Sequence, residues 1–386
     1  MKKYYLAGSL AMLFPLSAHA FNGILLTGTG QVSAGMGGVS IAAGSDRTSI
    51  SENPANLSFQ NAGADAQLAL LSVHSKANFL GQTEEHSSTQ FIPIPSWALV
   101  HHVDNQFSIG LSSIGAGASV DYDQSALHGY PADNAKDNLA IVTINPSFSY
   151  RPIPELSIGL ALNLGIEQFR AKGVLAGSDP QGSPVFLPSH GNQWAYGFGY
   201  TLGSTWNFQP DWYLGISYIS ETQFTKLDGY KEDLLAQSKG RINLPERYGI
   251  GLKYNFNKQL TLAADFQYIN WEDSDGLGKD SGFNWQNQKV YRLGLEYQLN
   301  DTSNIRLGYN HANKVVDSKD TLVNFYANAV ANQAWTVGYG HRFKFGTLNL
   351  AYEYALDNEV KGTGTSLGTN LKNENHVITL GLSKDF

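Results

Sequence analysis

The stretch LSIGLALNLGIE, residues 156–167, alternates strictly between large apolar side chains and small or polar ones. Its even-numbered positions carry leucine and isoleucine, and its odd-numbered positions carry serine, glycine, alanine, asparagine and glutamate. Because successive side chains of a β-strand point to opposite faces, this pattern predicts one apolar face and one small or polar face. Few strands of soluble proteins are this long.

The same alternation returns in three later stretches, residues 260–268, 291–298 and 348–354. Leucine and aromatic residues occupy most positions of one parity, while glycine, asparagine, glutamine and isolated charged residues dominate the other. A soluble sandwich also alternates, but its outward face usually carries more charge. The pattern therefore favours a barrel whose apolar face contacts lipid.

The connections between these stretches alternate between short and long polar segments, which is typical of strands in up-and-down order. Counting strands between them predicts about fourteen, which begin near residues 65, 89, 106, 138, 156, 193, 212, 237, 259, 284, 304, 332, 347 and 371. Trp206, Phe208, Trp212 and the terminal Phe386 are placed for an aromatic girdle at the end with the short turns. We predict an all-β fold, a 14-stranded antiparallel transmembrane β-barrel with periplasmic turns.

The first residues predict export. Lys2 and Lys3 precede an apolar stretch, and Ala18-His19-Ala20 fits an A-x-A cleavage site, so residues 1–20 are predicted to be a cleaved signal peptide. No later run reaches the roughly 18 apolar residues of a membrane-spanning helix. Without the two lysines, the formal net charge of −7 becomes about −9, which argues against nucleic acid as a partner. The predicted location is the outer membrane of a Gram-negative bacterium.

The segment SAGMGGVSIAAGSD, residues 33–46, and the following NPANL, residues 53–57, fit no strand of the pattern. About fourteen strands enclose a lumen too wide for wall side chains to fill. Small residues allow close packing, Asp46 suits a helix cap, and Pro54 excludes a regular ladder. We therefore predict that residues 21–62 form a hatch inside a barrel of residues 63–386. The alternative is an exposed periplasmic leader.

Several of these features resemble the FadL/TodX family of outer-membrane transporters for long-chain fatty acids and other hydrophobic compounds. The resembling positions are Gly35 to Ala43, Asp46, Asn53-Pro54-Ala55, Leu244 to Gly249, Asp265 to Trp271 and Phe386. The resemblance covers nearly the whole mature chain, and Asn53-Pro54-Ala55 is its most specific part. It implies a hatch-closed barrel that captures its substrate at the cell surface, binds it in a pocket inside the lumen, and releases it sideways through a gap made by a kink in the third strand.

The third predicted strand contains a candidate for that kink. Phe107, Ile109 and Leu111 set an outward parity, after which Ser113 breaks it and Gly115-Ala-Gly117 follows. Because the alternation of apolar and polar residues is lost beside two glycines, we expect a bulge or kink at Gly115 and Gly117. The alternative is a strand that ends under an extracellular loop.

Apolar residues in two long loops are candidates for substrate capture. They are Val174, Leu175, Val185, Phe186 and Leu187 in one loop, and Leu227, Tyr230, Leu234 and Leu235 in the other. Packing of the loops against each other would explain these residues almost as well.

Three arginines, Arg247, Arg292 and Arg306, share the inward parity and are possible contacts for a head group. A guanidinium can hold a carboxylate by charge-assisted hydrogen bonds. The alternative is that they pair with inward carboxylates or with the hatch. These carboxylates are Glu167, Asp265, Glu296 and Glu353.

Catalysis and metal binding have little support. The chain has no cysteine, His101 and His102 point to opposite faces of a strand, and no zinc or nucleophile motif is visible. We predict a passive transporter for hydrophobic small molecules, such as long-chain fatty acids or hydrocarbon-like compounds, that acts as a monomer among outer-membrane lipid and lipopolysaccharide and needs no cofactor. A general diffusion porin and an outer-membrane lipid-modifying enzyme are the alternatives.

Overall fold

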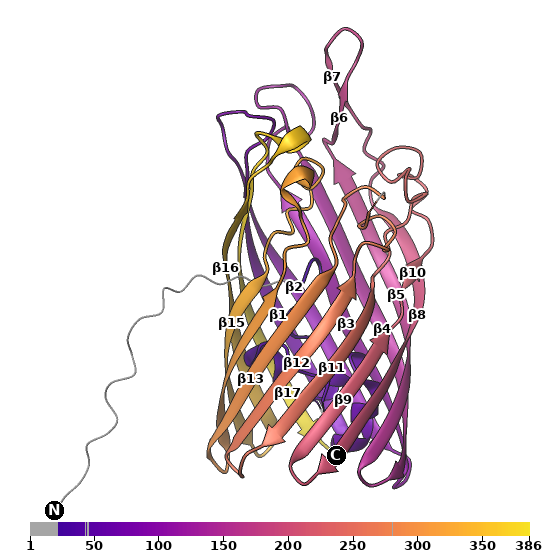
Figure 1. Cartoon of the computed structure of the whole chain (residues 1–386), viewed down its shortest axis with the longest axis vertical. Coiled ribbons are helices and arrows are strands. Elements are labelled where there is room, and N and C mark those ends of the chain that lie inside the picture. The colour runs from indigo at the N-terminus through magenta and orange to yellow at the C-terminus, as the bar shows by residue number, and fades with distance from the viewer. Residues whose placement is uncertain (1–21, 43, 45, 280) are drawn as a thin grey trace, which may run out of the picture.

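Long alternating stretches form fourteen antiparallel strands that close into a barrel (Figure 1). The computed structural model describes residues 22–42, 44, 46–279 and 281–386, so the predicted signal peptide lies outside the described residues. The wall strands are β1 (Gly63–Ala77), β2 (His86–His102), β3 (Phe107–Asp121), β4 (Lys136–Ile153), β5 (Leu156–Lys172), β8 (Gln193–Gln209), β9 (Trp212–Ile219), β11 (Glu246–Asn255), β12 (Leu260–Asn270), β13 (Gln288–Asn300), β14 (Ser303–Ala312), β15 (Gln333–Phe343), β16 (Gly346–Val360) and β17 (Leu371–Asp385). The predicted antiparallel barrel of fourteen strands is confirmed.

Closure of the barrel follows from the strand pairing. Consecutive wall strands pair in order, and β1 also pairs with β17, so every wall strand has two neighbours. A two-residue strand, β10 (Gln223–Phe224), adds to β8 above the end of β9, and β6 (Leu175–Ser178) pairs with β7 (Pro184–Phe186) in a hairpin that projects beyond the wall (Figure 1). Connections of two to four residues at one end face loops of eight to twenty-six residues at the other. This asymmetry places the turns in the periplasm and the loops outside the cell.

Most strand starts agree with the sequence prediction, but one does not. The eighth strand was expected near residue 237 and begins at Glu246. The loop before it folds on itself, because Leu227 N donates to Gly240 O and Gly240 N donates to Leu235 O. Its apolar side chains, Leu227 and Leu235, are buried inside the loop, so the apolar signal reflects local packing and not a strand.

The wall is apolar outside and polar inside. Leu162 and Ile166 are each 39% exposed on the outer face, whereas the inward Glu167 is fully buried. At the turn end, Phe208 lies beside Trp212, whose ring stacks on Tyr254 at 4.1 Å. The reversal of the usual burial pattern is that of a lipid-facing barrel with an interfacial aromatic girdle.

The segment before β1 lies inside the barrel, and we call it the hatch. It contains three short 3₁₀ helices, η1 (Ser33–Met36), η2 (Arg47–Ser51) and η3 (Pro54–Phe59). In Figure 1 most of it is the indigo chain in the lower half of the lumen. The helix η1 packs on β13 to β16, η2 on β1 to β3, and η3 on β3, β4, β5 and β8, so the hatch touches most of the wall.

Two further 3₁₀ helices, η4 (Ser318–Asp320) and η5 (Gly364–Ser366), lie in the long loops. In the part of the chain that the structure describes, no helix has the length and apolar character needed to cross a membrane.

Candidate functional site

Glycines let the hatch backbone lie directly on the wall. A Cβ atom at Gly35 would lie 2.9 Å from the Cα atom of Gly338, and one at Gly37 would lie 2.6 Å from the carbonyl oxygen of Tyr309. Gly37 also has a φ of +68°, in the left-handed region that glycine tolerates best, and its N–H donates to Thr336 Oγ1 at 2.8 Å. The glycine-rich stretch is therefore explained by contact between two backbones.

The Asn53-Pro54-Ala55 motif fixes the end of the hatch to β5 and β8. Asn53 Oδ1 accepts from Ala55 N at 3.1 Å, while Asn53 Nδ2 donates to Ile41 O at 2.7 Å and to Thr205 Oγ1 at 3.1 Å. Pro54 occupies the first turn of η3, where its missing N–H costs nothing. A Cβ at Gly159 of β5 would lie 2.4 Å from Ala55 N, so the wall also needs glycine here.

An arginine of the hatch binds the wall where the barrel closes. Arg47 Nη1 lies 2.7 Å from Asp65 Oδ1 on β1, and Arg47 N donates to Asp65 Oδ2 at 2.8 Å. Arg47 also pairs with Asp385 on β17. Because Arg47 and Asp65 are both buried, removal of Arg47 would leave the charge of Asp65 unpaired in the interior.

Asp46 joins two parts of the hatch. It directly precedes η2, as the cap prediction requires, but its Oδ2 accepts from the backbone N–H groups of Val32 and Ser33 at 2.8 and 2.9 Å. Its Oδ1 accepts from Thr48 Oγ1 at 2.6 Å. Burial raises the pKa of Asp46 above its ordinary value. The carboxyl group thus connects η1 to η2 and does not cap the N–H groups of η2.

A second ionic contact holds the middle of the hatch. Glu52 Oε1 lies 2.9 Å from Arg247 Nη1, and Glu52 Oε2 accepts from Gln267 Nε2 at 2.9 Å. Arg292 Nη2 donates to Gln267 Oε1 at 3.0 Å. Burial by itself would raise the pKa of Glu52, but the charges of Arg247 and Arg292 outweigh it and hold the pKa below its ordinary value. Glu52 is therefore an ionised anchor at neutral pH.

The wall has a break between β2 and β3. Pairing of these strands ends at Trp97 and Ser113, although β3 remains paired with β4 up to Asp121. At the extracellular end of the break, Asp121 N donates to Ser88 Oγ at 3.0 Å. The upper half of the β2–β3 junction thus lacks its backbone ladder, and we call this part the β2–β3 gap.

Gly115 and Gly117, the predicted kink residues, both lie in the β2–β3 gap. A Cβ at Gly115 would lie 2.6 Å from Ile94 Cγ2, so the Ile94 side chain of β2 reaches across the gap. Gly117 N donates to Ile24 O at 3.0 Å, which gives β3 a partner from the start of the hatch in place of β2. The gap is therefore covered from inside by residues 22–26.

Residues 22–26 also fill the lumen beside the gap. Leu26 packs with Ile94 in a buried apolar cluster, and a Cβ at Gly23 would lie 2.6 Å from the Trp271 ring. A cavity of about 30 Å³ remains next to this segment, which is room for about one water molecule and too little for an apolar ligand. The inner end of the gap is closed in this conformation.

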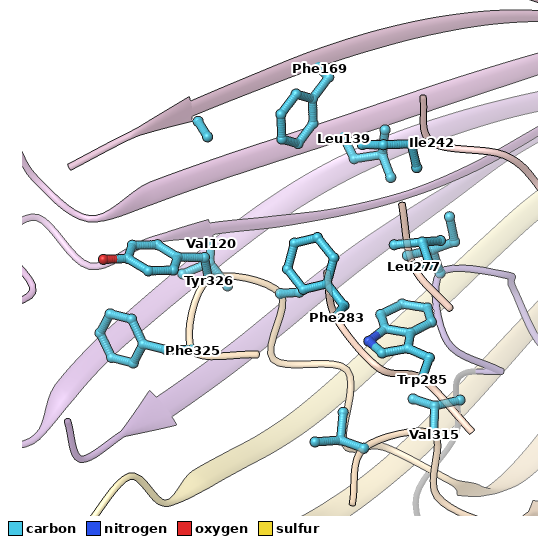
Figure 2. Close-up of a cluster of buried hydrophobic side chains, with 14 of the residues drawn as sticks. Val120, Leu139, Phe169, Ile242, Leu277, Phe283, Trp285, Val315, Phe325 and Tyr326 are labelled. Carbon is cyan, nitrogen blue, oxygen red and sulfur yellow. The ribbon is translucent and has the colours of Figure 1, made fainter. Parts of the chain in front are cut away.

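A much larger cavity, of about 690 Å³, lies among the extracellular loops, and we call it the outer cavity. Phe169 from β5 and Phe283 and Tyr326 from two loops line it, and Figure 2 shows these side chains among neighbouring apolar residues. The volume is in the range of pockets that bind small organic ligands.

The predicted capture residues divide between the outer cavity and the packing of the loops. Four of them line the cavity: Val174, Leu175, Leu187 and Leu234. Leu227, Tyr230 and Leu235 are buried, and the Tyr230 hydroxyl donates to Gly191 O at 3.0 Å. Val185 is exposed on β7, and Phe186 stacks on Tyr130 at 5.6 Å. Loop packing therefore describes some of these residues, and substrate capture by the four that line the cavity stays a prediction.

The three predicted head-group arginines do not meet at one place. Arg247 and Arg292 line the small inner cavity. Arg306 lies nearer the periplasm, where its Nε is 2.6 Å from Glu296 Oε2 and its Nη1 donates to Asn349 Oδ1 at 2.8 Å. Pairing with carboxylates and the hatch, the alternative from the sequence, describes Arg247 and Arg306 in this conformation.

Some residues of the site were not predicted from the sequence. Residues 22–26 precede the glycine-rich stretch, and only contacts with distant residues place them against the gap. Asp137 is the first of the alternating inward-facing residues of β4, and it lines the outer cavity. That alternation could have identified Asp137 as an inward carboxyl. Among the described residues, no group of three or more histidine, cysteine, aspartate or glutamate side chains is arranged to hold a metal ion.

Comparisons with known proteins give a consistent result. The model of a family described as outer membrane protein transport protein (OMPP1/FadL/TodX) matches residues 14–384. Outer membrane protein P1 of Haemophilus influenzae is 23% identical over 287 residues, which are 63% of this chain and 62% of that relative's length.

Solved structures of the same kind share the fold. The toluene transporter TodX of Pseudomonas putida superposes with a TM-score of 0.70 at 18% identity, over 94% of this chain and 99% of TodX. A FadL homologue of Pseudomonas aeruginosa gives a TM-score of 0.68 at 14% identity, over 96% of this chain and 100% of the homologue. At these identities, the likeness supports the barrel architecture alone.

Proposed function

Because the chain belongs to the outer membrane transport protein family OMPP1/FadL/TodX, we propose that it is a passive transporter of hydrophobic small molecules. The family and the barrel place it in the outer membrane of Gram-negative bacteria. The observation that carries the proposal is the break in the β2–β3 ladder below an apolar outer cavity, in a barrel whose axis the hatch blocks. Fatty acids and hydrocarbon-like compounds are the substrate classes that this arrangement suits.

Capture takes place in the outer cavity. Each methylene group that leaves water for an apolar surface contributes about 0.8 kcal/mol, so a lining of phenylalanine, leucine and valine favours a long or aromatic apolar ligand. Val174, Leu175, Leu187 and Leu234 contact the ligand. Val185, Phe186, Leu227, Tyr230 and Leu235 shape the loops that enclose it.

Release takes place sideways. An axial route passes η1 to η3, which are held by ion pairs and backbone contacts, whereas the β2–β3 gap is covered mainly by Ile94 and residues 22–26. Displacement of residues 22–26 opens a path from the lumen to the lipid. An apolar cargo on this path does not re-enter water, so it keeps the free energy gained on burial.

The remaining assignments complete the proposal. Residues 1–20 are removed on export, residues 21–62 act as the hatch, residues 63–386 form the barrel, and the protein works as a monomer among outer-membrane lipid and lipopolysaccharide. Arg247, Arg292 and Arg306 stay predicted head-group contacts. Transport of this kind needs neither a catalytic residue nor a cofactor.

Two measurements, one on purified protein and one on cells, test the proposal. In planar bilayers we expect no steady ion conductance, because the hatch fills the lumen. In cells that express the protein we expect uptake of a radiolabelled long-chain alcohol or fatty acid to exceed that of cells with an empty vector. Steady conductance together with uptake of small sugars would contradict the proposal and indicate a diffusion porin.

A further inference from the structure

The outer cavity contains carboxyl groups and no basic side chain among the described residues. Among the described residues that line it, Asp137 and Asp233 bear carboxyl groups, and neither lysine nor arginine is present. The rest of the lining is largely apolar, as the side chains of Phe169, Phe283 and Tyr326 in Figure 2 illustrate. A ligand that enters this cavity therefore meets carboxyl groups and no cation.

Asp137 has an unused hydrogen-bond acceptor. Its side chain is 5% exposed, and its Oδ1 atom has no hydrogen-bond partner. Neighbouring cations are directed elsewhere, since Lys136 binds Asp121 at 2.6 Å and Arg170 lies on the opposite face of β5 from Phe169. A buried acceptor without a donor is costly, so a ligand that brings a donor gains free energy here.

Asp233 differs from Asp137 because its carboxylate is already engaged. Its Oδ2 lies 2.7 Å from His190 Nε2, and its Oδ1 accepts from Leu234 N at 2.6 Å. Oδ1 of Asp137 is therefore the carboxyl oxygen without a partner among the residues that line the outer cavity.

The inner cavity offers the complementary group. Arg292 is 4% exposed, and although its Nη2 donates to Gln267, its Nε has no partner. Arg247 is held by Glu52, which an incoming carboxylate would have to displace. A single unpartnered N–H donor can be satisfied by a neutral oxygen acceptor.

We propose that the preferred cargo is an uncharged apolar molecule with one hydroxyl group, a long-chain alcohol or a phenol. This inference rests on the proposed transport function. A hydroxyl donates to Asp137 in the outer cavity and, once displacement of residues 22–26 has enlarged the inner cavity, accepts from Arg292 there. A carboxylate has no donor for Asp137 Oδ1, while a hydrocarbon satisfies neither group.

The test compares 1-octanol, octanoate and octane as ligands of the full protein held in amphipol, by equilibrium dialysis of labelled ligand. The three ligands have different free energies of transfer from water. The measured quantity is therefore the change that a substitution makes in the ratio of two ligands' affinities. We expect Asp137→Leu to lower the octanol to octane affinity ratio at least tenfold, about 1.4 kcal/mol. We expect Asp137→Asn, whose amide adds an N–H donor, to raise the ratio of the octanoate affinity to the octanol affinity at least tenfold.

Asp228→Asn is the matched control, because Asp228 is exposed and pairs with Lys231 at 3.0 Å outside the cavity lining. It should leave both ratios unchanged. Retained octane binding shows that the cavity of Asp137→Leu is intact, and the isosteric Asp137→Asn keeps the test decisive if the leucine variant fails to fold. Ratios that stay within twofold in Asp137→Asn would overturn the inference but leave the transport proposal standing. Failure of all three ligands to bind the wild-type protein would instead overturn the transport proposal.

Discussion

The two halves of the lumen are closed in different ways. In the periplasmic half, the hatch is bound by buried ion pairs such as Arg47 with Asp65, and by glycines that bring backbones into contact. In the extracellular half, apolar side chains and one short segment, residues 22–26, cover an incomplete wall. Charged and backbone contacts are specific and costly to break, whereas apolar contacts can be exchanged for a ligand of similar character. The comparison explains why cargo is expected to leave through the wall and not along the axis.

The largest expected effect comes from the ion pair of the periplasmic half. Arg47→Met leaves Asp65 buried without its partner, and we expect a loss of about 3–5 kcal/mol in the free energy of unfolding. Urea titration of the purified protein, followed by tryptophan fluorescence, measures it. The double variant Arg47→Met/Asp65→Leu should recover part of the loss. A single variant as stable as the wild type would show that the ion pair does not hold the hatch.

A smaller effect is expected from backbone contact at Gly37. Its added Cβ would meet two carbonyl oxygens, of Tyr309 and Leu293, at 2.6 and 2.7 Å, so Gly37→Ala should cost about 2–3 kcal/mol in the same titration. Gly81→Ala is the matched control, since Gly81 has a similar φ of +74° with no atom within 4 Å. It isolates the backbone strain, which we expect to cost about 1 kcal/mol. Equal costs at both sites would mean that contact with the wall contributes nothing.

In the extracellular half, a substitution should change binding and not stability. Leu234→Ser removes apolar lining from the outer cavity, and we expect ligand affinity to fall about fivefold, from roughly 1 kcal/mol of lost apolar contact. Val185→Ser changes an exposed residue outside the lining and should leave the affinity within twofold. Dialysis with labelled ligand measures both. Equal losses in the two variants would contradict the placement of the binding site in the outer cavity.

The smallest effect is a pH dependence confined to the hatch. The folded-state pKa of Glu52 lies below the ordinary 4.5, so its stabilisation is present above that pH and is lost as pH falls toward the folded-state pKa. Asp46 opposes this trend, because its raised pKa makes acid favour the folded state. We expect Glu52→Gln to reduce the acid destabilisation seen by thermal unfolding between pH 6 and pH 3, chosen to bracket roughly the ordinary carboxyl range. An unchanged pH profile would show that Glu52 is not an ionised anchor.

The sequence predicted the wall better than the lumen, for a physical reason. Alternation is a local property of the chain, so residues 156–167 reveal a strand without any knowledge of their neighbours. It failed near residue 237, where a loop buries Leu227 and Leu235 within itself. Small residues and Asn53-Pro54-Ala55 indicated a hatch, but Gly159, against which Ala55 packs, lies about one hundred residues away in the chain.

The gap shows the same limit. Gly115 and Gly117 indicated an irregular third strand, but whether β2 still pairs with it depends on contacts from Ile94 and Ile24. The three inward arginines were recognised, although parity could not separate Arg306 at the periplasmic end from Arg247 and Arg292 at the inner cavity. Long-range partners decide these points, and a single sequence does not contain them.

Exit of the cargo through the β2–β3 gap can be tested directly, because the chain has no native cysteine. In Ile94→Cys/Gly115→Cys, the Cβ atoms lie 3.9 Å apart, within the range of disulfides, so oxidation would link the strands across the gap. Ala98→Cys/Ser112→Cys, at a pair that is already in register, is the control. Uptake of a labelled long-chain alcohol by cells should fall at least tenfold in the oxidised gap variant, return with reductant, and stay normal in the control. Unchanged uptake through a fully oxidised gap would contradict the lateral route.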